Sequence, residues 1–120
     1  MSAVPRALPR PRVTESAYQD LVADYLRLHK FKVFHARPAQ TGRGWKTPVQ
    51  YDGKGFVDLL CVGHGRVIAI EIKVGRGRLT AEQTEWAEAF LDLDDKVGAY
   101  WHLTPEGWDG FVKWLKWWLE

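Results

Sequence analysis

The sequence predicts an α/β domain built around a mixed sheet, and three observations lead to this fold class. Two runs rich in Val, Ile and Leu flank Gly63-His64-Gly65, which is the pattern of a β-hairpin. Two segments, residues 14–30 and 80–93, repeat apolar residues at helical spacing behind a capping Thr. A last apolar run, residues 96–103, follows the second segment, so that helix predicts a crossover to a strand beside the hairpin.

Length and composition fit one globular domain preceded by a short arm. The chain has 120 residues, of which 46% are hydrophobic and 13% aromatic, enough for a packed core. We expect residues 1–13 to form a basic, Pro-rich arm and residues 14–120 the domain, with no apolar stretch suited to a signal peptide or membrane span. The single Cys61 excludes an internal disulfide and predicts a buried thiol in a reducing, cytoplasmic protein. The net charge of +2 is too small to establish nucleic-acid binding.

The first helix is predicted to start behind Thr14 and to end near Lys30. Glu15 and Gln19 lie on the side of its apolar stripe, so both polar groups can face the sheet at the first turns of the helix. An acid in the first turn also complements the helix dipole, which contributes about 0.3 to 1 kcal/mol. Both explanations of Glu15 stay open.

The next segment predicts a first strand over residues 31–37, ended by Pro38, and then a long polar loop over residues 39–54. The loop contains Gly, and its basic residues alternate with aromatic ones. This composition suits contact with a nucleic-acid backbone and with unstacked bases, and a solvated loop is the alternative. The residues concerned are Arg43, Trp45, Lys46, Tyr51 and Lys54.

The hairpin over residues 55–74 carries charges inside apolar strands. A two-residue turn at His64 and Gly65 pairs Gly63 with Arg66 and therefore places Asp58 opposite Glu71, with Cβ atoms about 5 Å apart. Lys73 projects from the same face. Two opposed carboxylates destabilise a sheet unless a cation compensates them, and Mg²⁺ binds such oxygen ligands. A solvated edge-strand pair of Glu71 and Lys73 is the alternative.

The second helix follows a basic turn that contains Arg76 and Arg78. Thr80 and Gln83 have the spacing of a capping box, which gives Gln83 a structural explanation. The tail, residues 104–120, predicts a short helix with one aromatic stripe that covers the core or forms a dimer surface. A membrane-surface helix and a base-stacking platform are further alternatives. The stripe consists of Phe111, Trp114, Leu115, Trp118 and Leu119.

Together these segments resemble the VRR-NUC family of the PD-(D/E)XK nuclease superfamily over residues 14–103. The resemblance rests on the order of the elements and on four short motifs. Val57 departs from the superfamily pattern, which has Pro there, at a position that supplies shape and no ligand. The matching pieces are Glu15 with Gln19, Gly55-Phe-Val-Asp58, Glu71-Ile-Lys73 and Leu79-Thr-Ala-Glu-Gln83.

The resemblance implies a restriction-endonuclease-like α-β-β-β-α-β core, here with an extra C-terminal Trp-rich helix. It implies a metal-dependent endonuclease that hydrolyses DNA phosphodiester bonds, selective for branched DNA such as four-way junctions or flaps in replication, recombination or repair. Similar proteins of bacteria and viruses imply a homodimer in the bacterial or host cytoplasm. The alternatives are a nucleic-acid-binding module of this fold that does not cleave, and an interaction protein that uses the Trp-rich tail.

The resemblance also implies the roles of individual residues. Asp58, Glu71 and the carbonyl of Ile72 would hold Mg²⁺ or Mn²⁺, and Glu15 would complete the site directly or through water. Lys73 would orient the attacking water or neutralise charge in the transition state, and Gln83 would support the ligands. Charge and placement alone suggest the phosphate contacts, which are Arg37, Arg43, Lys46, Lys54, Arg76 and Arg78.

Overall fold

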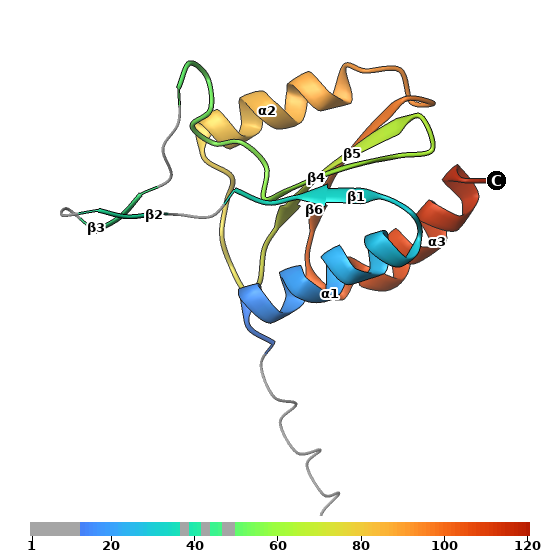
Figure 1. Ribbon diagram of the computed structural model, residues 1–120, viewed down its shortest axis with the longest axis horizontal. Coiled ribbons are helices and arrows are strands. Elements are labelled where there is room, and N and C mark those ends of the chain that lie inside the picture. The colour runs from blue at the N-terminus through green and yellow to red at the C-terminus, as the bar shows by residue number, and fades with distance from the viewer. Residues whose placement is uncertain (1–12, 37–38, 42–43, 47–49) are drawn as a thin grey trace, which may run out of the picture.

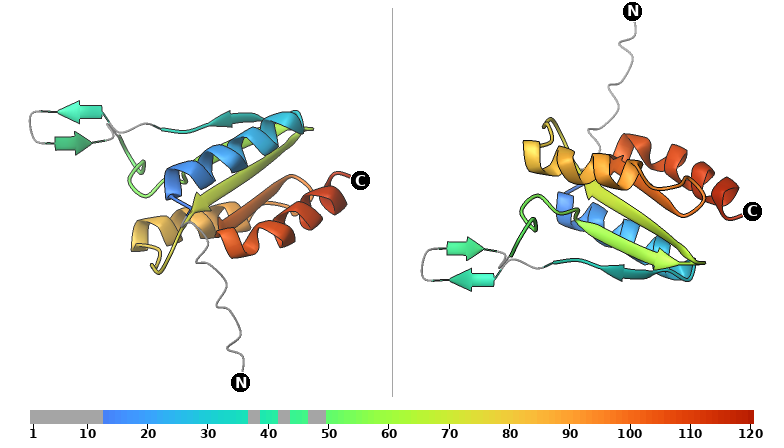
Figure 2. Two further views of the ribbon diagram at one scale, coloured as in Figure 1. Left: turned by 90° about the horizontal axis from the view of Figure 1, so that it is seen from below. Right: turned by 90° about the horizontal axis from the view of Figure 1, so that it is seen from above.

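The computed structural model describes residues 13–36, 39–41, 44–46 and 50–120 (Figure 1). A four-stranded mixed sheet forms the centre, with α1 and α3 on one face and α2 on the other (Figures 1 and 2). The elements are α1 (Glu15–Leu28), β1 (Lys32–Phe34), β2 (Ala39–Thr41), β3 (Gly44–Lys46), β4 (Leu59–Gly63), β5 (Arg66–Ile72), α2 (Ala81–Leu91), β6 (Gly98–Leu103), a 3₁₀ turn (Pro105–Gly107) and α3 (Trp108–Trp118).

Helix α1 begins at the predicted cap and ends two residues earlier than predicted. The Thr14 hydroxyl accepts a hydrogen bond from the Ala17 N–H at 3.0 Å, which satisfies one of the unpaired amides of the first turn. At the other end, Lys30 has a φ of 70°, so the chain leaves the helix there. The Phe31 N–H then donates to the Leu26 carbonyl at 3.0 Å. The cap is therefore confirmed, and the helix end was predicted too late.

The hairpin β4–β5 has the predicted turn and register. His64 and Gly65 have φ values of 56° and 70°, which this two-residue turn requires, and Gly63 pairs with Arg66. The ladder ends at the pair Leu59 and Ile70. Asp58 therefore lies just before the strand, and the predicted pair of Asp58 with Glu71 follows the same register one position beyond the last pair of the ladder.

The remaining strands complete the sheet in the order β1-β4-β5-β6. β6 lies parallel to β5, with α2 as the crossover, as predicted. β1 is antiparallel to β4 and spans three residues only, so the predicted strand over residues 31–37 was too long. The segment predicted as a loop over residues 39–54 contains a second small sheet, in which β2 pairs with β3. Strands of three residues are too short to produce a recognisable alternation of apolar and polar positions.

The core fills the space between the sheet and the helices α1 and α3. Phe111 and Leu115 of α3 are fully buried against this face, and Trp118 is 7% exposed. The aromatic stripe of the tail therefore covers the core of its own chain, and the prediction of a dimer surface loses this stripe as its basis. Across the part of the chain that the structure describes, no helix has the length and apolar character needed to cross a membrane.

Candidate active site

Four segments meet at the end of the sheet where β5 terminates. They are the first turn of α1, the residue before β4, the end of β5 and the first turn of α2. Gln83 in α2 donates a hydrogen bond to Glu71, and the charges of Asp58 and Glu15 act on the pKa of Glu71. The structure thus brings together four of the predicted site residues from distant parts of the sequence.

The Asp58 carboxylate is held by the end of the neighbouring strand. Its Oδ2 accepts a hydrogen bond from the Ile72 N–H at 2.7 Å, so a side-chain bond continues the contact with β5 beyond the last pair of the ladder. The backbone of Asp58 is held as well, because its carbonyl accepts a hydrogen bond from His35 Nδ1 at 2.8 Å. A carbonyl cannot donate, so the proton of His35 lies on Nδ1. Sequence reasoning assigned His35 no role.

Glu71 is a buried carboxylate with an unsatisfied oxygen. Its side chain is 5% exposed, and Oε1 accepts a hydrogen bond from Gln83 Nε2 at 3.0 Å. Oε2 has no hydrogen-bond partner among the described residues. Burial raises the pKa of Glu71 to about 8, and the charges of Asp58 and then Glu15 add to this effect. Both effects disfavour the ionised form of the Glu71 carboxyl.

Gln83 performs both functions that the sequence left open. Its Oε1 accepts from the Thr80 N–H at 2.8 Å, and its own N–H donates to the Thr80 hydroxyl at 3.1 Å, which completes the capping box. With the carbonyl end of the amide fixed in this way, the NH₂ group points at Glu71. The same side-chain conformation of Gln83 therefore caps α2 and supports the Glu71 carboxylate.

Gly55 allows the segment before Asp58 to pack against the start of α2. Its φ is 80°, and a Cβ at this position would lie 2.6 Å from the Glu82 Cβ and 2.8 Å from the Gln83 nitrogen. Lys54 adds an ion pair with Glu82 at 3.2 Å. The Gly of the predicted motif thus sets the distance between Asp58 and the helix that carries Gln83.

Lys73 follows β5 and is half-buried. Its N–H donates to the Leu103 carbonyl at 3.0 Å, which extends the pairing of β5 with β6 by one residue. The side chain lies along the loop that follows, because a Cβ at Gly77 would be 2.7 Å from Lys73 Nζ. Lys73 forms no ion pair with any carboxylate in the described ranges.

The donor set fits a hard divalent cation held by few protein ligands. Within the described residues, no group of three His, Cys, Asp or Glu side chains lies close enough to hold a metal. Glu15 is exposed and raises the pKa of Glu71 through its charge, and its role as a ligand, directly or through water, stays a prediction. The unsatisfied Glu71 oxygen beside Asp58 fits Mg²⁺, which commonly takes one or two carboxylates together with water and substrate oxygens.

The predicted phosphate contacts are only partly placed. Arg37 and Arg43 lie outside the described residues, and of Lys46 the structure places the backbone, in β3. Lys54 is paired with Glu82. Arg76 and Arg78 are exposed in the loop between β5 and α2, next to Lys73 in the chain.

Tyr100 on β6 is a residue of this region that sequence reasoning missed. Its hydroxyl is buried without a hydrogen-bond partner among the described residues. Burial raises the pKa of Tyr100 to about 12, and the charges of Glu71 and Asp58 contribute. No sequence signal marks Tyr100, because its relation to Glu71 depends on the parallel register in which His102, two residues later, pairs with Glu71.

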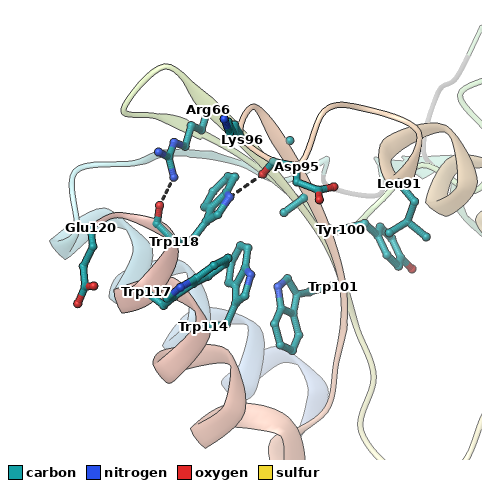
Figure 3. Close-up of a pocket in the computed structure, with 12 residues that line it drawn as sticks. Arg66, Leu91, Asp95, Lys96, Tyr100, Trp101, Trp114, Trp117, Trp118 and Glu120 are labelled. Atoms are coloured by element: carbon teal, nitrogen blue, oxygen red, sulfur yellow. Dashed lines mark hydrogen bonds between the residues drawn. The ribbon is translucent and has the colours of Figure 1, made fainter.

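A groove lies along β6 and α3, and neither Glu71 nor Asp58 lines it. This groove of about 790 Å³ contains stacked indoles, with Trp114 and Trp118 ring centroids 4.8 Å apart (Figure 3). Arg66 lies 4.8 Å from the centre of the Trp118 ring and donates to the Trp118 carbonyl. Trp118 Nε1 donates to the Asp95 carbonyl at 2.7 Å. The groove extends from the end of α3 to the turn before β6.

Comparison with known proteins assigns no family. No family model matches the chain, and no curated protein and no solved structure matches it.

Proposed function

We propose that this protein is a Mg²⁺- or Mn²⁺-dependent endonuclease of the VRR-NUC type that hydrolyses phosphodiester bonds in branched DNA. The observation that carries the proposal is Glu71, a buried carboxylate whose free oxygen lies beside a second carboxylate at the end of a sheet. A buried charge without a counter-charge is costly, so such a pair indicates a cation site.

The order of the elements supports the proposal. Without the small β2–β3 hairpin, the chain follows the order α1, β1, β4, β5, α2, β6, which agrees with the α-β-β-β-α-β order expected of a restriction-endonuclease-like core. The motif residues Asp58, Glu71 and Gln83 are connected by hydrogen bonds or by charge. Residues that resemble a family motif in sequence thus also lie together in space.

The residues of the site would have three separate roles, which are to bind the metal, to orient its ligands and to bind the phosphate. The metal, when bound, polarises the scissile phosphate and lowers the pKa of its water. Asp58, Glu71 and the Ile72 carbonyl would hold it. The Ile72 N–H and Gln83 keep the two carboxylates in fixed orientations. The ammonium group of Lys73 would then bind the phosphate oxygen on which charge develops, or orient the attacking water.

The exposed cations around the site would hold the DNA backbone. Arg76 and Arg78 lie in the loop after Lys73. Lys54 lies close to the first turn of α2, because it forms an ion pair with Glu82. The loop also contains two Gly residues, of which Gly75 has a φ of 83° and open space around it. Such a loop can approach a phosphate closely.

The test is a cleavage panel on linear, flapped, splayed and four-way DNA, with Mg²⁺ and with a chelator. We expect Glu71→Gln and Asp58→Asn to abolish cleavage, because each removes a charged metal ligand, while DNA binding stays. Glu88→Gln on the exposed side of α2 is the matched control and should cleave normally. Full activity of Glu71→Gln at saturating Mg²⁺ would overturn the site.

A second candidate is a nucleic-acid-binding module that does not cleave. It is favoured by one observation, the lack of a third metal-binding side chain in the described part of the site. The two candidates differ in metal binding, which titration calorimetry with MnCl₂ measures directly. Binding of Mn²⁺ to the wild type and not to Asp58→Asn supports the nuclease, whereas DNA binding without any Mn²⁺ uptake supports the module.

A further inference from the structure

Tyr100 lies on the same face of the sheet as Glu71. The parallel register pairs Tyr100 with Ala69 and His102 with Glu71. Alternate residues of a strand share a face, so Tyr100 and Glu71 are diagonal neighbours on adjacent strands. Ala69, which is fully buried between them, has the small side chain that leaves room for the phenol ring beside Glu71.

Two unsatisfied polar atoms occur in this one region. Of all buried side-chain nitrogen and oxygen atoms in the described residues, Glu71 Oε2 and the Tyr100 hydroxyl are the two without a hydrogen-bond partner. A buried polar atom without a partner destabilises the folded state. The two are also chemically complementary, because a hydroxyl donates and a carboxylate oxygen accepts.

Tyr100 also lines the indole groove, at the end of it that includes Leu91. Figure 3 shows its ring on the side of β6 opposite Trp101, next to Leu91. With a pKa raised to about 12, the hydroxyl keeps its proton at neutral pH and remains a donor. The charges of Glu71 and Asp58 contribute to that shift, which agrees with their proximity.

We propose that Tyr100 is a positioning residue of the carboxylate site, whose hydroxyl holds a bound water against Glu71 Oε2. Buried waters typically satisfy such otherwise unpaired groups. The water fixes the second oxygen of Glu71, as Gln83 fixes the first. The consequence for metal binding rests on the proposed function, whereas the contact between Tyr100 and Glu71 does not.

The first experiment measures metal affinity and kinetics. Tyr100→Phe keeps the ring and removes the hydroxyl, so we expect about tenfold weaker Mn²⁺ binding by calorimetry, as for other groups that orient a metal ligand. The kcat should fall with the KM for DNA unchanged. The matched control is Tyr18→Phe, which removes another half-buried hydroxyl, bonded to the Thr104 carbonyl at 2.7 Å. It should lower stability and leave Mn²⁺ affinity unchanged.

The second experiment needs no metal. The protein is labelled with ¹³Cζ-tyrosine and kept in chelator, and the Tyr100 resonance is assigned by its loss in Tyr100→Phe. This resonance should shift in Glu71→Gln. It should stay in place in Glu88→Gln, which is the control. An unshifted resonance would overturn the proposal, as would equal Mn²⁺ affinity of wild type and Tyr100→Phe. A shifted resonance in a protein that binds no Mn²⁺ would keep the contact and refute the nuclease function.

Discussion

At the scale of single residues, the main feature of the site is the unequal hydrogen bonding of the two Glu71 carboxylate oxygens. One of its oxygens has a partner in Gln83 and the other has none in the described chain. Burial and the neighbouring Asp58 both disfavour the ionised form, so the metal-free protein keeps Glu71 protonated at neutral pH. A bound cation would reverse this preference, which makes the protonation of Glu71 and metal binding compete.

The raised pKa of Glu71 predicts that the metal-free protein becomes less stable as the pH rises. Burial raises this pKa from 4.5 to about 8, so between these values folded Glu71 holds a proton that the unfolded chain has released. Unfolding therefore releases a proton, and the free energy of unfolding falls across this window. Glu71→Gln does not titrate and should be more stable than the wild type above pH 8, as thermal unfolding with chelator will measure.

Two controls separate this effect from general changes in charge. Glu88→Gln, on the exposed side of α2, should follow the wild-type pH dependence. Excess Mg²⁺ should restore the stability of the wild type at high pH and have no effect on Glu71→Gln, because only ionised Glu71 gains from the cation. Equal slopes for wild type and Glu71→Gln would contradict the buried carboxylate.

The sequence was informative for residues whose partners are close along the chain. The capping box of Thr80 and Gln83 and the turn at His64 and Gly65 are local patterns, and both are confirmed. Tyr100 could not be found in this way, because its relation to Glu71 depends on the register of parallel strands joined by a helix. The same holds for His35, whose partner Asp58 is 23 positions away.

At the scale of elements, the position of α2 against the segment before β4 builds the site. Three contacts fix it: the close approach at Gly55, the ion pair of Lys54 with Glu82 and the hydrogen bond from Trp86 Nε1 to the Asp52 carbonyl at 2.8 Å. The ion pair is largely exposed and contributes little. The backbone contact at Gly55 therefore has the greatest effect on the distance between Asp58 and Gln83.

Gly55→Ala should lower both stability and activity. A positive φ costs a non-glycine residue about 1 to 2 kcal/mol, and the clash with the first turn of α2 adds about 1 to 3 kcal/mol. Denaturant unfolding should show this loss, and cleavage should fall because the helix is displaced from Asp58.

The matched control is Gly75→Ala. Gly75 has a similar φ of 83° with nothing within 4 Å of a new Cβ, so this variant carries the backbone strain without the clash. Equal unfolding free energies for Gly55→Ala and Gly75→Ala would show that the contact with α2 is unimportant.

The elements themselves were predictable where apolar residues recur with a clear period. The three helices and the strands β4, β5 and β6 are present with ends shifted by a few residues. The β2–β3 hairpin was not predicted, since its short strands carry no periodic signal. Of the alternatives that the sequence left open for the tail, the burial of Phe111 and Leu115 supports covering of the core.

At the scale of the whole molecule, the described part of the chain offers one carboxylate site and two edges of the four-stranded sheet, β1 and β6. β6 forms an edge of the sheet, and the indole groove runs beside it. Trp117 lines this groove together with Trp114 and Trp118 and is 67% exposed, whereas Trp118 is 7% exposed. Exposed edges and exposed aromatic surface are typical of contacts between protein molecules.

The last prediction is that the protein forms a homodimer through this groove. Two symmetric cuts in a branched DNA need two sites in fixed relation, and a twofold contact would place the same patch of both copies together. Trp117→Ala should weaken the dimer without lowering the melting temperature, because Trp117 lies outside the core. Trp118 is unsuited to this test, since its ring is buried and its Nε1 donates a hydrogen bond to the Asp95 carbonyl.

Sedimentation over a range of concentrations measures the assembly. The control is Leu28→Ala, at a side chain of α1 that is 78% exposed, and it should leave the assembly unchanged. A wild type that stays monomeric at high concentration, with and without DNA, would refute the dimer and leave the groove to a different partner.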